Sequence, residues 1–177
     1  MKQTLLSLFV LFVISIAGLK ILSATQVDQG KPVSITPMGR TISGQRMSFM
    51  TGSGIWDQFR LVVRDRDLWV EVWKRIHSID PDNLNSNGGQ LPSLPEIDFS
   101  REIVIVAAMG RRPSSGYGIF IDSAYERNDR LEVVVRSVEN RRCGGFTMMT
   151  APVDIVRLPK TDRPVLFRET EVVLDCR

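Results

Sequence analysis

Histidine and cysteine are scarce in this chain of 177 residues, which has one histidine, His77, and two cysteines, Cys143 and Cys176. A Ser-His-Asp or Cys-His arrangement would have to use His77, and no GxSxG nucleophile motif occurs in the sequence. CxxC, HExxH, GxGxxG and phosphate-binding GxxxxGK[ST] motifs are absent as well. The sequence therefore predicts a protein that is not an enzyme and that holds no metal or cofactor.

The chain also lacks a large excess of charge of either sign. The chain has 23 lysines and arginines against 20 aspartates and glutamates, a formal net charge of +3. Hydrophobic residues make up 43% and charged residues 24%, both close to the average of globular proteins. This composition excludes wholesale disorder and a protein with many membrane spans.

The N-terminus carries the one long apolar segment without charge, from Leu5 to Leu19, preceded by Lys2 and followed by Lys20 and Ala24. This layout predicts a signal peptide over residues 1–24, and an uncleaved N-terminal anchor is the alternative. Removal of the segment would leave 21 basic against 20 acidic residues. We therefore expect an exported protein, periplasmic or secreted, with no nucleic-acid partner and no stable membrane span after cleavage.

The two cysteines would both belong to the exported part. In an oxidising compartment a disulfide between Cys143 and Cys176 is the expected state, and it would close a loop of about 34 residues. The alternative is two separate thiols.

The rest of the chain predicts a flexible arm or linker over residues 25–54 and one α+β domain over residues 55–177. The arm is rich in Ser, Thr, Gly, Gln and Pro. In the domain, Trp69, Trp73 and Ile76 have helical spacing, which predicts one packed helix near 66–78 with the tryptophans in the core. A ligand platform formed by the two tryptophans is the weaker interpretation.

The remaining patterns predict a mostly antiparallel β-sheet of about six to seven strands. The apolar run from Ile103 to Met109 is typical of a central strand covered on both faces. Alternating residues from Tyr117 to Ile121 and from Leu131 to Arg136 indicate a hairpin. Further strands are expected over 56–63, 146–150, 153–158, 164–167 and 172–174, and a long loop over 80–98, either a binding loop or a variable insertion.

The turn from Gly110 to Gly118 lies between two of these strands and is the candidate for binding. Pro113 fixes φ, and Gly116 can adopt positive φ, so the turn should be stiff. A second turn, 139–145, also has two arginines followed by glycines. The candidate protein-binding residues are Arg111, Arg112, Pro113, Ser114, Ser115, Gly116 and Tyr117, with Arg141 and Arg142 as a second group. The alternative is an ordinary β-connection with solvated arginines.

Several segments resemble the PrcB C-terminal domain family, named for a bacterial protease-complex subunit. They are Ile97-Asp98-Phe99, the sequence RPSSGYGI at 112–119, and Ala151-Pro152, and the similarity extends over residues 55–167. The resemblance implies an exported, non-catalytic accessory subunit that binds a protein partner and assists or stabilises a peptidase complex.

A second similarity leads to another function. The segment Pro113-Ser114-Ser115-Gly116-Tyr117 is similar to a loop of chagasin-like inhibitors of papain-type peptidases, and Cys143-Gly144-Gly145 to their glycine-rich second loop. Arg112 stands where those inhibitors have asparagine. This similarity implies a peptidase inhibitor, and an envelope protein with an unrecognised enzymatic pocket is a further alternative.

Overall fold

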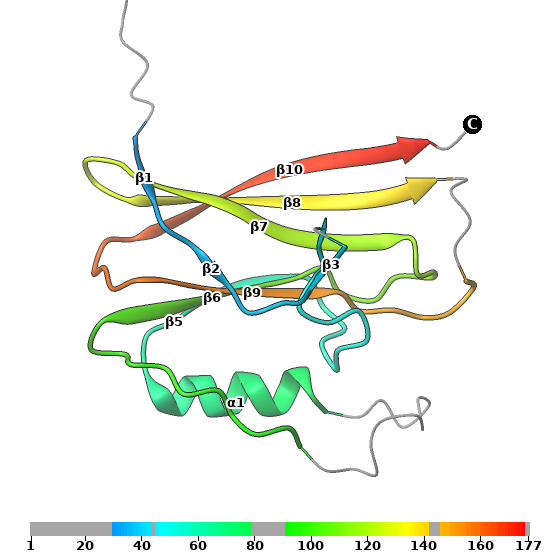
Figure 1. Cartoon of the computed structure of the whole chain (residues 1–177), viewed down its shortest axis with the longest axis horizontal. Coiled ribbons are helices and arrows are strands. Elements are labelled where there is room, and N and C mark those ends of the chain that lie inside the picture. The colour runs from blue at the N-terminus through cyan, green and yellow to red at the C-terminus, as the bar shows by residue number, and fades with distance from the viewer. Residues whose placement is uncertain (1–29, 44, 79–90, 142–145, 176–177) are drawn as a thin grey trace, which may run out of the picture.

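The computed structural model describes residues 30–43, 45–78, 91–141 and 146–175. In this part of the chain two four-stranded β-sheets stack on each other, and one α-helix covers the outer face of the second sheet (Figure 1). The predicted α+β fold, with mostly antiparallel strands and one packed helix, is confirmed. Its strands are divided between two main sheets and a small hairpin.

The first sheet has the strand order β1-β7-β8-β10. Its strands are β1 (Lys31–Val33), β7 (Tyr117–Glu126), β8 (Leu131–Arg141) and β10 (Val165–Asp175). β7 and β8 form the predicted antiparallel hairpin. β10 runs parallel to β8, from Val165 opposite Leu131 to Asp175 opposite Arg141. This pairing departs from the antiparallel prediction because the chain crosses to the other sheet and returns between these two strands.

The second sheet has the order β2-β9-β6-β5 and is antiparallel throughout. Its strands are β2 (Thr36–Pro37), β9 (Val153–Pro159), β6 (Glu102–Ala108) and β5 (Phe59–Val63). β6 is a central strand, as its apolar run predicts. Ile103 and Ile105 face the first sheet, and Val104 and Val106 face the helix. Both faces of β6 are therefore covered, which explains why its sequence does not alternate.

Helix α1 (Arg66–Ile76) begins where the Asp65 side chain accepts a hydrogen bond from the Leu68 backbone N–H at 2.9 Å. Trp69 and Trp73 are buried in the core, as predicted. Each indole N–H donates to a backbone carbonyl of the following segment, Trp69 to Pro95 and Trp73 to Pro92, both at 3.1 Å. The two tryptophans thus fasten residues 92–95 onto the helix.

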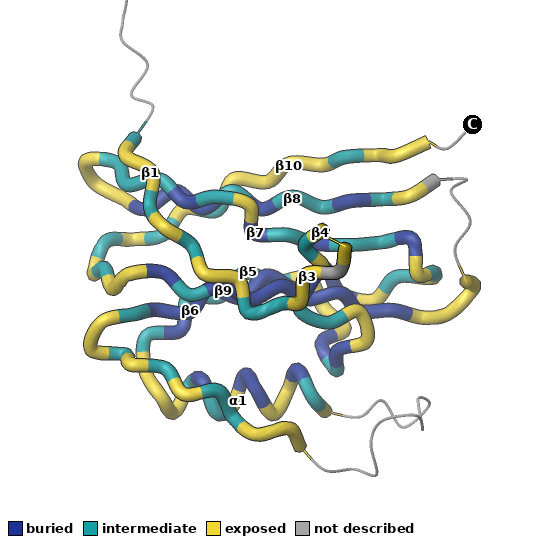
Figure 2. Tube along the Cα trace, in the orientation of Figure 1, coloured by how far each residue is buried: buried dark blue, intermediate teal, exposed yellow. Residues whose placement is uncertain are grey.

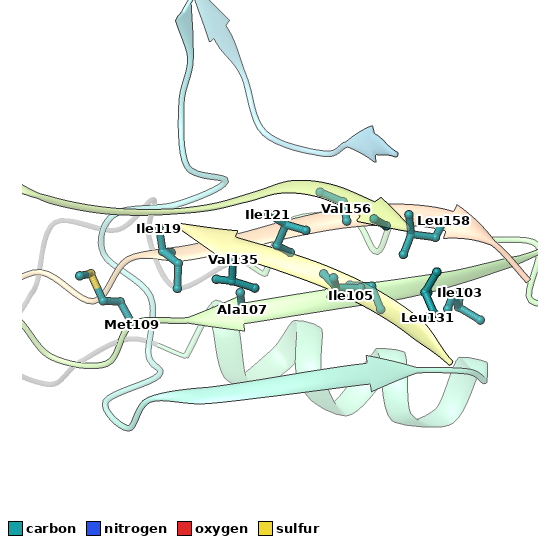
Figure 3. Packing of buried hydrophobic residues seen from close by; sticks show 12 residues of the cluster. Ile103, Ile105, Ala107, Met109, Ile119, Ile121, Leu131, Val135, Val156 and Leu158 are labelled. Carbon is teal, nitrogen blue, oxygen red and sulfur yellow. The ribbon is translucent and has the colours of Figure 1, made fainter. Parts of the chain in front are cut away.

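The hydrophobic core has two layers. One cluster fills the space between the two sheets, with Ile105, Ile119 and Val135 among its members (Figure 3). The other lies between the second sheet and helix α1 and includes Trp69, Val104 and Ile155. Figure 2 shows the buried residues concentrated in these layers.

The segment 30–54 differs from the flexible arm that we expected, because its residues pair with both sheets. β1 pairs with β7 and β2 with β9, while β3 (Thr41–Ile42) and β4 (Gln45–Arg46) form a hairpin. The Ser48 hydroxyl donates to the Ile119 carbonyl at 2.9 Å and accepts from the Ile119 N–H at 3.2 Å. These contacts satisfy backbone groups along the edges of β7 and β9 that would otherwise be unpaired, which is the physical reason for the ordered path.

Other expected elements also differ in extent. The strand expected over 56–63 begins at Phe59. Residues 164–167 and 172–174, expected to supply one or two strands, belong to a single strand, β10. Residues 146–150 contribute a single bridge, Thr150 with Arg112, because Phe146, Met148 and Met149 face solvent rather than a partner strand. The predicted signal peptide, residues 80–90 of the expected loop and both cysteines lie outside the described residues.

Candidate protein-docking face

The turn begins at Gly110, where the backbone has a positive φ of 75°. A Cβ atom at this position would lie 2.9 Å from the Trp56 carbonyl oxygen and 2.9 Å from the Gln58 nitrogen. The next residue, Arg111, donates its backbone N–H to the same Trp56 carbonyl at 3.0 Å. Glycine is therefore required here by conformation and by close packing. The sequence pattern favours positive φ at Gly116. In the structure, the described turn residue with positive φ is Gly110.

Residues 146–150 fasten the turn from one side. Arg112 and Thr150 exchange backbone hydrogen bonds at 2.7 and 2.9 Å, and the Thr150 hydroxyl donates to the Ser114 carbonyl at 2.8 Å. The Ser115 hydroxyl accepts from the Phe146 N–H at 2.9 Å, and the Ser115 N–H donates to the Phe146 carbonyl at 3.1 Å. The predicted stiffness of the turn thus comes from a second segment as well as from Pro113.

The end of β8 fastens the turn from the other side. The Asn140 N–H donates to the Gly116 carbonyl at 2.7 Å, and a Cβ atom at Gly116 would lie 3.1 Å from the Asn140 carbonyl oxygen. The backbone of Arg141, the last residue of β8, therefore follows directly beside the turn. The side chain of Arg141 and all of Arg142 lie outside the described residues, so the second group of candidate binding residues, Arg141 and Arg142, stays a prediction.

The two described arginines of the turn lie against aromatic rings. The guanidinium carbon of Arg111 is 3.9 Å from the Trp56 ring centroid, and that of Arg112 is 5.9 Å from the Tyr117 ring centroid. Arg111 is exposed, whereas Arg112 is half-buried and donates from Nη1 to the Arg111 carbonyl at 2.8 Å. Within the described ranges, neither arginine forms an ion pair with a carboxylate. Aromatic rings and the turn backbone hold the two guanidinium groups in place, and no carboxylate in the described ranges neutralises their charge.

Tyr117 joins the turn to the interior. It is half-buried, packs against the core between the sheets, and donates from its hydroxyl to Glu139 Oε1 at 3.4 Å. Tyr117 therefore contributes to the core as well as to the turn. Pro113 and Ser115 are exposed at the tip of the turn.

Large apolar side chains surround this turn, and sequence analysis did not assign them to the site. Phe146 is 81% exposed, Met149 52%, Met148 50% and Trp56 43%. The sequence pattern places all four in strands, although the adjacent pair Met148-Met149 already breaks a two-residue alternation. We define the docking face as Trp56, Arg111, Arg112, Tyr117, Phe146, Met148 and Met149.

A polar depression lies elsewhere, between β2, β9 and the turn before β6. Its lining residues are Ser34, Thr36, Asp98, Arg101, Glu102, Arg157, Leu158 and Pro159. Two of its charged groups, Arg157 and Glu102, form an ion pair at 3.3 Å. Asp98 accepts hydrogen bonds from the Ser100 hydroxyl and N–H, which lower the pKa of Asp98. These contacts hold the turn at 98–102 in place.

The described residues contain no group of three or more His, Cys, Asp or Glu side chains that could hold a metal ion. None of the helices in the described ranges is long and apolar enough to span a membrane.

These observations define a two-sheet β domain that carries one helix and presents a fastened turn beside exposed apolar side chains. Residues 103–159, from β6 through the turn to β9, match the family model described as PrcB C-terminal. The predicted resemblance is confirmed, over a shorter segment than the 55–167 expected. Neither the curated proteins nor the solved structures contain a match to this chain.

Proposed function

We propose that this chain is an exported, non-catalytic accessory subunit that binds a protein partner through the docking face. The observation that carries the proposal is the combination of two positioned, uncompensated arginines with Phe146, Met148 and Met149 exposed beside them. Arginine and aromatic residues dominate binding hot spots, and methionine adapts to irregular partner surfaces. A turn that is already fastened loses little conformational entropy when it docks.

A peptidase complex is the proposed setting, on the strength of the match to the PrcB C-terminal family model. The chagasin-like alternative uses the same turn, with Pro113 and Ser115 exposed at its tip. The two functions differ in what they do to a peptidase: an inhibitor blocks papain-type activity directly, whereas an accessory subunit leaves papain active. Titration of papain with the purified protein separates them, and stoichiometric inhibition would replace the accessory function with inhibition.

Export is the second part of the proposal and has its own test. The apolar segment Leu5 to Leu19 before Ala24 should be removed in the host, so the mature chain should begin near Thr25. Intact-mass measurement of the protein from its host reports the cleavage directly. A full-length chain that stays in the membrane fraction would show an uncleaved anchor instead.

The docking face is tested by photo-crosslinking in the host. A photoreactive amino acid at position 146 should crosslink one defined partner, identified by mass spectrometry. The matched control carries the same group at Asn128, an exposed residue in the turn between β7 and β8. Equal crosslinking from positions 146 and 128, or none from 146, would remove the docking face from the proposed function.

A further inference from the structure

The outer edge of β10 is a second surface with the features of a binding site. β10 has 11 residues and pairs with β8 on one side, and in the described part of the chain no strand pairs with its other side. Leu166 is 48% exposed, Val173 42% and Leu174 47%. Figures 1 and 2 show this strand along the margin of the first sheet, largely exposed. A long, open, partly apolar edge is a template for another strand.

The charges on β10 oppose pairing with a second copy of the same strand. In a two-fold antiparallel pair, directly opposite residues lie on the same face, so residues of the same parity meet. With Thr170 opposite itself, Glu169 meets Glu171 of the other copy twice. Centring the pair on Glu169 or Glu171 places that glutamate opposite itself, and centring it on 172 or 173 places a glutamate opposite Asp175. Centring it on Arg168 opposes two arginines.

The two glutamates have different surroundings. Arg60 of β5 donates to both carboxylate oxygens of Glu169, from Nε at 2.7 Å and from Nη2 at 2.8 Å, which holds this side chain at the edge. Glu171 is exposed and forms no ion pair with any residue in the described ranges. An opposite charge placed directly across from Glu171 would stabilise a strand pair, whereas a like charge destabilises it.

We propose that the outer edge of β10 accepts an extended strand of a partner protein, with a lysine or arginine opposite Glu171 and apolar residues beside Leu166 and Leu174. Glu169, Glu171 and the other charges of β10 disfavour a second copy of this chain on the same edge in the registers centred on residues 168 to 173. The backbone hydrogen bonds of strand addition provide the affinity, and the charge of the central residue provides the selectivity. This edge is separate from the docking face, so either surface can fail its test without the other.

The exclusion of a second copy is tested by Glu171→Lys. In the pairing centred on Thr170 this change converts both glutamate–glutamate pairs into pairs of opposite charge, each between Glu169 and the introduced lysine. Self-association in sedimentation equilibrium should become about tenfold tighter or more than in the wild type, by the size of cross-strand charge effects. The matched control is Glu71→Lys, the same charge change on the exposed side of helix α1, which should associate no more than the wild type. A Glu171→Lys chain that associates no more than Glu71→Lys overturns the exclusion, and so does a wild type that dimerises through β10.

Strand addition is tested with an eleven-residue peptide of alternating valine and threonine that carries a central lysine, long enough to reach Leu166 when the lysine lies opposite Glu171. Binding should protect backbone amides of β10 from hydrogen exchange in the full chain. A peptide with central glutamate should bind at least about fivefold more weakly, and Glu171→Lys should reverse this preference. A lysine peptide N-methylated at alternate amides should not bind. Absence of protection in β10, or binding that does not depend on the central charge, would overturn the proposal.

Discussion

Arg46 and Asp154 form an ion pair across the edge of the two-sheet core, between β4 and β9. Asp154 is fully buried, and its Oδ2 also accepts from the Ile121 N–H at 2.8 Å. Arg46 Nη1 donates to the Ile121 carbonyl at 2.7 Å. Two side chains thus satisfy a backbone position of β7 where the neighbouring strand β1 has ended. The pair attaches segment 45–48 to both sheets.

This ion pair predicts a specific dependence of stability on pH. Burial is the largest influence on Asp154 and raises its pKa to about 6 from 3.8, although the Arg46 charge and the Ile121 N–H act in the opposite direction. The folded state therefore binds a proton more readily than the unfolded state between these values, so this group lowers the free energy of unfolding as pH rises from about 4 to above 6. The loss is on the order of 3 kcal/mol at most.

The substitution Asp154→Asn removes the carboxyl group that titrates. In chemical denaturation between pH 4 and 7.5, the free energy of unfolding of the variant should fall less steeply with rising pH than that of the wild type. Asp129→Asn is the matched control, because Asp129 is an exposed carboxylate paired only with its neighbour Arg130. Identical pH profiles for the wild type and Asp154→Asn would contradict the raised pKa.

Gly110→Ala should destabilise the domain by about 1 to 3 kcal/mol, because φ is 75° and the added Cβ would lie 2.9 Å from two backbone atoms. Gly52→Ala is a matched control, since a Cβ at Gly52 meets no atom within 4 Å and its φ is not positive. Thermal melts should show a lower midpoint for the first variant and little change for the second. Equal melting midpoints for the two variants would contradict the positive φ and the close packing at Gly110.

The docking face predicts binding losses without loss of stability. Arg111→Ala and Phe146→Ser should each weaken capture of the crosslinked partner by on the order of 2 kcal/mol, because both side chains are exposed and contribute little to folding. Arg112 is a poorer probe, since its side chain is half-buried against the turn. Arg130→Ala, at an exposed arginine between β7 and β8, is the control. Undiminished capture by stable Arg111→Ala and Phe146→Ser proteins would contradict the proposed face.

The disulfide between Cys143 and Cys176 remains a prediction, and the register of β8 and β10 supports it. Asp175 pairs with Arg141 at the ends of two adjacent strands, and the chain continues from these positions into the two cysteines. Reduction should lower the melting temperature by several degrees, given roughly 3 to 4 kcal/mol from closure of the loop. The double variant Cys143→Ser, Cys176→Ser should not respond to reductant. Two free thiols in the denatured, unreduced protein would refute the pairing.

The helix, the central strand β6 and the β7–β8 hairpin could be predicted because each depends on residues close together in the sequence. The spacing of Trp69, Trp73 and Ile76 places them on one face of a helix whatever the rest of the fold. The apolar run at 103–109 requires a strand that is covered on both faces. The turn at 110–118 could be predicted for the same reason, since Pro113 and glycine act on the local backbone.

Segment 30–54 and the apolar part of the docking face could not be predicted in this way. The polar composition of 30–54 indicates an arm, yet Ser48 and Arg46 bind backbone groups of β7 that are more than 70 residues away in the sequence. The pattern around Phe146 and Met149 indicates a strand, because apolar side chains next to a glycine turn usually face a core. Their exposure depends on where the other strands end.

The sequence by itself predicted the resemblance to the PrcB C-terminal family, the helix, the main strands and the stiff turn with its arginines, because periodicity and backbone restriction act over a few residues. Tertiary structure alone decided the division into two sheets, the parallel pairing of β10, the ion pair of Arg46 with the buried Asp154 and the exposure of Phe146, Met148 and Met149. These features depend on which distant backbone edges meet and which hydrogen-bonding groups remain to be satisfied. That balance is set only when the whole chain is packed.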